Sequence, residues 1–196
     1  MDEKDRMRRA MLAARSAHVK AATKAGDAAS SEASNQANAL AAHAAKLKGQ
    51  IIATYLPLGG EIDPRPLMAA LRQQGAGLAL PVCVDEEAPM VFRRYKPGDG
   101  LLPDAMGIVA PRATAQQVTP DIVLLPLLAF DGAGRRLGRG GGFYDRTLAK
   151  LRDTTPCRFL GLAFDMQMVD KCPTAPHDEP LHGVLTPSIW HEFNED

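Results

Sequence analysis

The sequence predicts an α/β fold: a three-layer α/β/α sandwich with a mostly parallel sheet, preceded by two N-terminal helices. Three observations support this prediction. From residue 50 onwards, short apolar runs alternate with helical patterns, as expected when strands and helices follow one another. Residues 122–128 are apolar throughout, which is typical of a central strand covered on both faces. Residues 1–48 have helical periodicity instead, so we expect them to precede the sheet.

The N-terminal region reads as two helices separated by a break at residues 26–27. On the first helix, Met7, Met11 and Val19 approximate one face, with Arg8 and Arg15 beside it. On the second helix, small and apolar residues recur at spacings of four and three, which favours close packing on a neighbour. These residues are Ala33, Ala37, Leu40, Ala44 and Leu47.

After this region, strands and helices can be assigned in order. Strands are expected at residues 51–56, 78–82, 90–95, 122–128 and 158–164. Asp63 is a suitable N-cap with Pro64 at the first helical position, and the helix that follows should end at Gly75. A second helix is expected at residues 143–151. Residues 97–120 are rich in Pro and Gly and have little regular signal beyond 107–110.

Length and charge limit the possible functions. A chain of 196 residues, 45% of them hydrophobic, can bury one core, so we expect a single domain over residues 1–196. Twenty-three basic residues balance 23 acidic ones, which leaves no excess of positive charge for binding nucleic acid. No run approaches the ~20 apolar residues of a membrane span, so no membrane association is expected.

The cellular location is expected to be the cytoplasm. Residues 1–15 carry eight charged side chains and no apolar segment of the kind that directs export. The three cysteines are Cys83, Cys157 and Cys172, an odd number without Cys-x-x-Cys spacing. Reduced thiols in a reducing compartment are therefore the simplest interpretation.

The most informative segment is residues 135–149, which directly follows the apolar run. It contains four glycines, at Gly138 and at positions 140–142. Glycine allows positive φ and brings backbone N–H groups close to a ligand. Because a helix is expected from Phe143, the loop would present its ligand to a helix N-terminus, where an anion is favoured. The pattern predicts a polyphosphate site.

Other glycine-loop types do not fit this segment. A Walker loop needs Gly-Lys followed by Ser or Thr, and no lysine lies between Lys96 and Lys150. A dinucleotide fingerprint counted from Gly138 would need glycine at position 143, which is Phe143. The Arg139-Gly-Gly sequence occurs once only, which gives little support for RNA binding.

With these motifs, the chain resembles the 5-formyltetrahydrofolate cyclo-ligase family, also called methenyltetrahydrofolate synthetases, over nearly its whole length. The strongest matches are residues 120–131 (PDIVLLPLLAFD) and 136–145 (RLGRGGGFYD). Residues 55–64 (YLPLGGEIDP), the N-terminal Lys4, Met7 and Arg8, and His177-Asp178 give further support in the same order.

The resemblance implies an enzyme of one-carbon metabolism that cyclises 5-formyltetrahydrofolate to 5,10-methenyltetrahydrofolate, with ATP converted to ADP and phosphate. It implies phosphorylation of the formyl oxygen followed by attack of N10, with ATP as co-substrate and Mg²⁺ as cofactor. The partners would be small molecules only, and the chain is expected to be a monomer. Two alternatives stay open: an ATP-dependent ligase acting on another formyl or carboxyl compound, and a non-catalytic folate- or nucleotide-binding paralogue.

The resemblance also assigns residues to the site. Arg136 and Arg139 would be catalytic, and planar guanidinium groups suit phosphate oxygens. The ATP-binding residues would be Lys4, Arg8, Arg136, Leu137, Gly138, Arg139, Gly140, Gly141, Gly142, Phe143 and Tyr144. The folate substrate would contact Leu56, Glu61, Arg139 and Phe143.

Asp145 is the metal ligand that the resemblance implies, and its carboxylate oxygens suit a hard cation such as Mg²⁺. A first-turn carboxylate that stabilises the helix dipole is a compatible reading. A second ligand is left open between Asp178 and the position of His182, because the family usually has aspartate where this chain has His182. Imidazole is a poorer partner for Mg²⁺ than carboxylate.

Overall fold

The computed structural model describes residues 2–24, 42–47 and 51–193. The first predicted helix is present as α1 (Glu3–Lys24). Most of the second predicted helix, with the break at residues 26–27, lies outside the described residues. Its described end forms one short 3₁₀ turn, η1 (His43–Lys46), in which Ala44 is fully buried.

Eight strands form one mixed sheet in the order β12-β11-β10-β7-β1-β2-β3-β6. The five central strands are parallel: β1 (Ile51–Ala53), β2 (Gly77–Val82), β7 (Ile122–Pro126), β10 (Arg158–Leu162) and β11 (Gly183–Leu185). The edge strands are antiparallel: β3 (Val91–Tyr95), β6 (Gln117–Val118) and β12 (Trp190–Glu192). The expected parallel sheet is therefore confirmed at its centre, and the antiparallel edges make it mixed.

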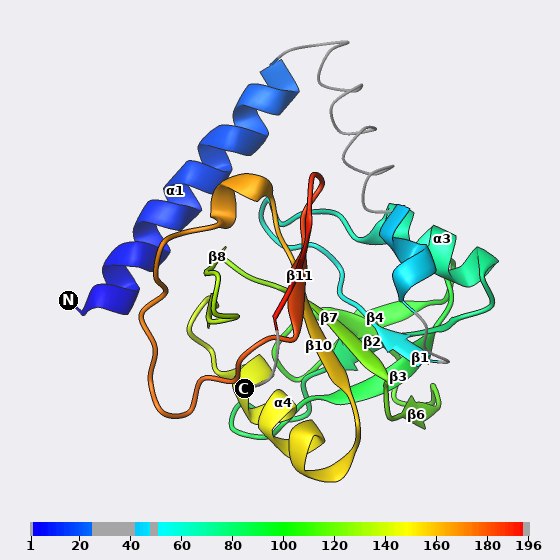
Figure 1. Cartoon of the computed structure of the whole chain (residues 1–196). Helices are drawn as coiled ribbons and strands as arrows, with labels where there is room; N and C mark the ends of the chain where they lie inside the picture. Colours follow the sequence, from blue (N-terminus) through cyan, green and yellow to red (C-terminus); the bar gives the residue numbers. More distant parts are fainter. Residues whose placement is uncertain (1, 25–41, 48–50, 194–196) are drawn as a thin grey trace.

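Alternating side chains divide the core into two layers, one on each face of the sheet. Ile52 and Leu124 contribute to the layer under α3 (Arg65–Gln73) and η1. Val123 and Leu125 contribute to the layer under α4 (Phe143–Thr154). Figure 1 shows α3 and α4 on opposite sides of the sheet. All four strand residues are at most 2% exposed, so β7 is covered on both faces as its apolar sequence predicts.

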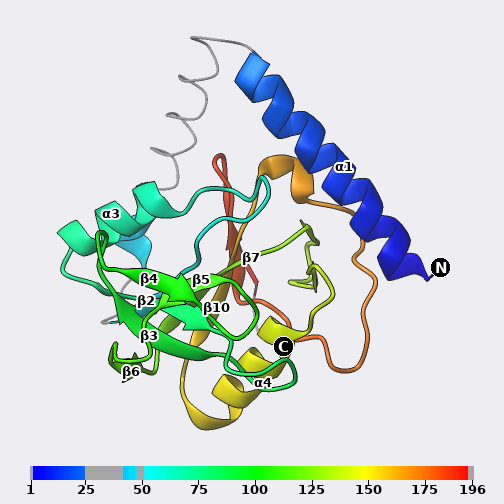
Figure 2. The same ribbon diagram turned by 180° about the vertical axis from the view of Figure 1, so that it is seen from behind.

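Helix α1 lies outside the sheet and the two helical layers that cover its faces. Met11 on its inner face joins a third cluster with Leu128, Leu137 and Cys172. Two of these residues belong to or adjoin the small hairpin β8 (Ala129–Phe130) and β9 (Arg136–Leu137), which follows β7. Figures 1 and 2 both show α1 along one side of the molecule, next to this hairpin. Helix α1 therefore covers the region beyond the carboxyl end of β7.

Residues 97–120 are more regular than the sequence predicts. They form the hairpin β4 (Leu101–Pro103) and β5 (Val109–Pro111), and then β6 at the sheet edge. The expectation of little regular structure is wrong here, in part because one ordering contact comes from outside the segment. The carboxylate of Asp104 accepts a hydrogen bond from the backbone N–H of Cys83, at 2.9 Å.

Smaller differences concern the ends of elements. The first predicted strand stops at Ala53, and α3 begins at Arg65, with Pro64 in place of Asp63 at the N-cap. Asp63 still accepts a hydrogen bond from the N–H of Arg65, at 3.0 Å, so it satisfies one of the free donors of that helix. The helix gives way at Gly75, with φ 89°, as predicted. Strands β11 and β12 were not expected from the sequence.

The three cysteines are free, as the sequence predicts, and all three are buried. Burial raises the pKa of Cys83 to about 11 and the pKa values of Cys157 and Cys172 to about 12. All three therefore stay as neutral thiols at physiological pH. Within the described residues, every helix is too short or too polar to cross a membrane.

Candidate functional site

The carboxyl ends of β1, β2 and β7 open into a cavity of about 220 Å³. In an open sheet with parallel strands, ligands bind at this edge. The wall is mainly apolar and comes from the loops after these strands, from the β4–β5 hairpin and from the glycine-rich loop. Among its residues are Tyr55, Leu56, Leu58, Leu80, Cys83, Met90, Ile108, Val109, Leu127 and Leu128.

The glycine-rich loop, residues 138–142, forms one side of this cavity. Gly140 has φ 101° and Gly142 has φ 68°, conformations that side chains with a Cβ rarely adopt. Gly142 is also the N-cap of α4, where no side chain caps the helix. The first N–H groups of α4 are therefore left for a ligand, and the helix dipole favours an anion there.

Arg136 lies at the base of the loop, on β9, with a side chain only 4% exposed. Its Nη2 donates to Oδ1 of Asp145, in the first turn of α4, at 2.6 Å. The same carboxylate oxygen accepts from the backbone N–H of Glu179, at 3.3 Å. Within the part of the chain that the structure describes, the buried Nε of Arg136 has no hydrogen-bond partner. A buried donor without a partner at a cavity wall suits a ligand oxygen.

Arg139 connects the glycine-rich loop to the loop that follows β1. Its Nε donates to Oε1 of Glu61 at 3.1 Å, and its Nη2 donates to the carbonyl oxygen of Leu58 at 2.6 Å. Oε2 of Glu61 accepts from the N–H of Leu58 at 2.9 Å. The carboxylate is nearly buried, with 5% of the side chain exposed, whereas Arg139 is 47% exposed. Arg139 therefore keeps nearly half of its side chain in solvent at the mouth of the cavity while it is paired with Glu61.

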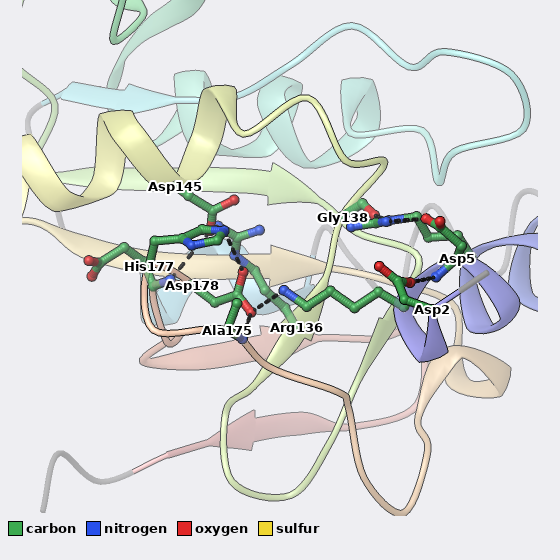
Figure 3. A network of polar contacts seen from close by, with 11 residues as sticks. Asp2, Asp5, Arg136, Gly138, Asp145, Ala175, His177 and Asp178 are labelled. Carbon is green, nitrogen blue, oxygen red and sulfur yellow. Dashed lines mark hydrogen bonds and ion pairs between the residues drawn. The ribbon is translucent and has the colours of Figure 1, made fainter. Parts of the chain in front are cut away.

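Helix α1 brings two cations to the outer side of the same loop. Lys4 Nζ pairs with Oδ2 of Asp178 at 2.5 Å. Arg8 donates from Nε to the carbonyl oxygen of Gly138 at 3.2 Å and from Nη1 to Asp5 at 2.7 Å. Figure 3 shows Gly138 and Asp5 together at one end of this network and Asp178 at the other. Neither cation lines the cavity itself.

The sequence of this chain is similar to those of known proteins. The model of the 5-formyltetrahydrofolate cyclo-ligase family matches residues 1–187. The chain belongs to this family. The 5-formyltetrahydrofolate cyclo-ligase of Escherichia coli K12 is 39% identical over 147 residues, 71% of this chain and 79% of that protein. The cyclo-ligase of Mycolicibacterium smegmatis is 35% identical over 150 residues, 72% of this chain and 76% of that protein.

Solved structures of cyclo-ligases, named there as 5,10-methenyltetrahydrofolate synthetases, have the same fold. The Aquifex aeolicus protein superimposes with a TM-score of 0.76 and 24% identity, over 100% of this chain and 95% of that one. The Mycoplasma pneumoniae protein gives a TM-score of 0.67 and 21% identity, over 93% of this chain and 98% of that one. The predicted α/β architecture is therefore confirmed.

Most residues that the cyclo-ligase resemblance assigns to the site line one cavity. They are Leu56, Glu61, Arg136, Gly138, Arg139, Gly140, Gly141, Gly142, Phe143, Tyr144 and Asp145. Segments as far apart as residues 56 and 145 meet here because β1 and β7 are neighbours in the sheet. Their individual roles remain predictions.

Leu137 does not line the cavity. Successive residues of a strand point to opposite sides, so Arg136 on β9 reaches the site while Leu137 packs into the cluster beneath α1. The side chain of His182 also has other partners. Its Nδ1 accepts from the backbone N–H of Phe159 at 2.9 Å, and the two rings meet edge to face at 5.2 Å. Of the two positions left open for a second metal ligand, Asp178 directly precedes Glu179, whose backbone N–H donates to Asp145.

Two kinds of site residue could not be found from the sequence. The wall residues Asp104, Ile108 and Val109 belong to residues 97–120, for which the sequence predicts no contact with the site. Arg15 lines the cavity from α1 and is 2% exposed. The only sequence signal for Arg15 is its position beside the apolar face of α1, which a surface arginine would share.

Asp104 holds the hairpin part of this wall. Besides Cys83, its carboxylate accepts from the N–H groups of Met106 and Ile108, at 2.9 and 3.0 Å. We expect Asp104→Ala to lower the free energy of unfolding by about 1–3 kcal/mol, because three donors lose a charged partner. Urea unfolding measures this. Asp99→Ala, which removes one exposed turn contact to the N–H of Lys96, is the control and should cost less than Asp104→Ala. Equal losses would contradict the special role of Asp104.

Proposed function

We propose that this chain catalyses the ATP-dependent cyclisation of 5-formyltetrahydrofolate to 5,10-methenyltetrahydrofolate, releasing ADP and phosphate. The observation that carries the proposal is the junction of two kinds of surface in one cavity. An apolar wall with the nearly buried carboxylate of Glu61 adjoins a glycine-rich helix N-terminus with Arg136 and Arg139. The apolar wall with its carboxylate suits a flat heterocycle, and the helix N-terminus with its arginines suits a polyphosphate. The names of the related proteins support the same reaction.

The chemistry explains why the two surfaces must adjoin. A formamide oxygen is a poor leaving group, so N10 of the folate cannot expel it directly. Transfer of the γ-phosphoryl group of ATP to that oxygen lets it depart as phosphate. N10 then closes the ring within the same molecule, where good alignment contributes about 7–11 kcal/mol of barrier reduction. The protein must mainly position two substrates and stabilise charge.

The nucleotide end of the site would be held by the glycine-rich loop. Backbone N–H groups of residues 140–143 bind the terminal phosphates, and Arg136 and Arg139 offset the charge on the transferring group. Lys4 and Arg8 approach the nucleotide from α1 after exchanging their present carboxylate partners for phosphate oxygens. This exchange keeps each cation paired before and after binding.

The folate end would be held by the apolar wall. Leu56 and Phe143 contact the substrate, and Tyr144 contributes the adjacent surface beneath α4. The ring of Phe143 also has the guanidinium of Arg146 5.1 Å from its centre, which fixes its orientation. Glu61 accepts hydrogen bonds from the pterin amino group and ring N–H.

We include Mg²⁺ in the proposal, held by Asp145 with Asp178 as the second carboxylate. Both hydrogen bonds that Asp145 accepts within the described residues go to Oδ1, and Oδ2 would be the oxygen that holds the cation. No group of three His, Cys, Asp or Glu side chains suited to a metal occurs in the described part of the chain. Mg²⁺ commonly binds one or two carboxylates and completes its shell with phosphates and water. When bound, the ion would neutralise phosphate charge.

We further propose that the chain acts as a single-domain monomer in the cytoplasm, without nucleic-acid or membrane partners. The sheet draws strands from residues 51 to 192, and one chain supplies every wall of the cavity. The buried free thiols are compatible with a reducing compartment.

An absorbance assay tests the proposed reaction. Purified protein with 5-formyltetrahydrofolate, ATP and Mg²⁺ should produce the methenyl chromophore, and omission of ATP or addition of EDTA should abolish it. Thermal stabilisation by both ligands without chromophore would support the non-catalytic alternative instead. ADP release with another formyl or carboxyl compound, but not with 5-formyltetrahydrofolate, would support a different ligase.

A further inference from the structure

Arg15 is a buried cation to which the proposed reaction gives no role. It lies on α1, is 2% exposed and lines the cavity. Its Nη1 donates to the carbonyl oxygen of Leu127 at 3.3 Å, and its Nη2 donates to that of Gly59 at 3.4 Å. Both distances exceed the usual 2.9–3.0 Å of N–H···O hydrogen bonds. Burying a guanidinium costs several kcal/mol, which two long bonds to neutral acceptors offset poorly.

The charged and polar groups that face Arg15 are Glu61, Arg139 and Tyr55. Burial lowers the pKa of Arg15, Arg139 lowers it further, and Glu61 and Tyr55 oppose this. Arginine nevertheless stays protonated in proteins, so a guanidinium and a carboxylate face the same apolar cavity. Both side chains form hydrogen bonds with the loop after β1, Arg15 with Gly59 and Glu61 with Leu58.

We propose that Arg15 is a substrate-binding residue, which donates a hydrogen bond to the ring carbonyl oxygen of the pterin beside the N–H groups accepted by Glu61. The inference rests on the proposed function and deepens it. One edge of a 2-amino-4-oxopterin presents, in order, a carbonyl acceptor, a ring N–H donor and an amino donor. A guanidinium next to a carboxylate offers the complementary donor and acceptors.

The other arginines at the cavity are occupied by different partners. Arg136 pairs with Asp145, and Arg139 stands on the exposed glycine-rich loop with half of its side chain in solvent. Among these three, only Arg15 is both buried and hydrogen-bonded, within the described residues, to backbone carbonyl oxygens alone. A guanidinium has five N–H donors, so donors remain for a ligand.

The test compares two ligands, each measured with the wild-type protein and with a variant of Arg15. Affinities are measured by calorimetry, with a non-hydrolysable ATP analogue in excess, for 5-formyltetrahydrofolate and for its 4-amino-4-deoxy counterpart. That counterpart replaces the carbonyl acceptor with an amino donor. The wild-type protein should prefer the 4-oxo ligand by about tenfold or more, as expected for a charged hydrogen bond. Arg15→Met, which keeps the length of the side chain, should bind the 4-oxo ligand about tenfold or more weakly and lose this preference.

Control variants distinguish a loss of pterin recognition from a general loss of structure. Arg93→Met removes a guanidinium that donates to the carbonyl oxygen of Ala115 at 2.7 Å, away from the cavity wall, and should leave the 4-oxo preference unchanged. Arg15→Lys keeps one donor and should retain part of the preference, and it replaces Arg15→Met if that variant does not fold. Equal weakening of both ligands would overturn the proposal. If the wild-type protein binds neither ligand and forms no chromophore, the proposed function itself has failed.

Discussion

Arg139→Ala should lower kcat/KM of the cyclisation by about a hundredfold or more while leaving the melting temperature nearly unchanged. The large kinetic effect is expected because the guanidinium would offset charge that develops on the transferring phosphoryl group. The small stability effect is expected because 47% of the Arg139 side chain is in solvent and the nearly buried Glu61 keeps the N–H of Leu58 and the nearby guanidinium of Arg15 as partners. Initial rates of chromophore formation and a thermal melt measure the two effects.

Two further variants sharpen this result. Arg139→Lys keeps the charge but not the planar fork, so its rate should lie between those of wild type and Arg139→Ala. Arg158→Ala removes another exposed arginine, 40% exposed and paired with Glu192 on the sheet edge, and should change neither rate nor melting temperature appreciably. A rate for Arg139→Ala close to wild type would contradict a role for this residue in phosphoryl transfer.

Asp145→Asn should also reduce kcat/KM by about a hundredfold or more, and in contrast to Arg139→Ala it should destabilise the fold. The substitution removes the charged partner of Arg136, whose side chain is 4% exposed, and leaves that cation buried without compensation. Because Asp145 is 20% exposed, we expect a loss of about 1–3 kcal/mol in the free energy of unfolding, below the value for a fully buried pair. Urea unfolding and chromophore assays give both numbers.

The magnesium dependence separates the two roles of Asp145. If the carboxylate holds Mg²⁺, the variant should need more Mg²⁺ for half-maximal rate. Asp153→Asn makes the same change at an exposed position of the same helix and should behave like wild type in every measurement. An unchanged magnesium requirement in Asp145→Asn, together with the expected loss of stability, would show that Asp145 is a structural partner of Arg136 only.

The parts of the molecule that the sequence predicts are those whose signal is local. The buried strand β7 is apolar at every position from Ile122 to Leu125, and the glycine-rich loop needs positive φ at Gly140 and Gly142. Such features depend on a few neighbouring residues. They predict the central strand of the sheet and the glycine-rich loop, whereas the other residues of the cavity are assigned by the family resemblance.

The parts that escape prediction depend on partners distant in sequence. The β4–β5 hairpin is ordered by Asp104, whose contact with Cys83 spans 21 residues. Arg15 is buried only because the chain returns 112 residues later to place the carbonyl oxygen of Leu127 beside it. For Leu137, by contrast, the family motif predicts a site residue that does not line the cavity. It lies within a family motif, but strand alternation turns its side chain away from the cavity.

The central claim is that the glycine-rich loop and its arginines bind the terminal phosphates of ATP. A crystal structure with a non-hydrolysable ATP analogue and Mg²⁺ tests it most directly. We predict β- and γ-phosphate oxygens within hydrogen-bond distance of the N–H groups of residues 140–143 and of Arg139. A triphosphate bound elsewhere, with this loop unoccupied, would contradict the account.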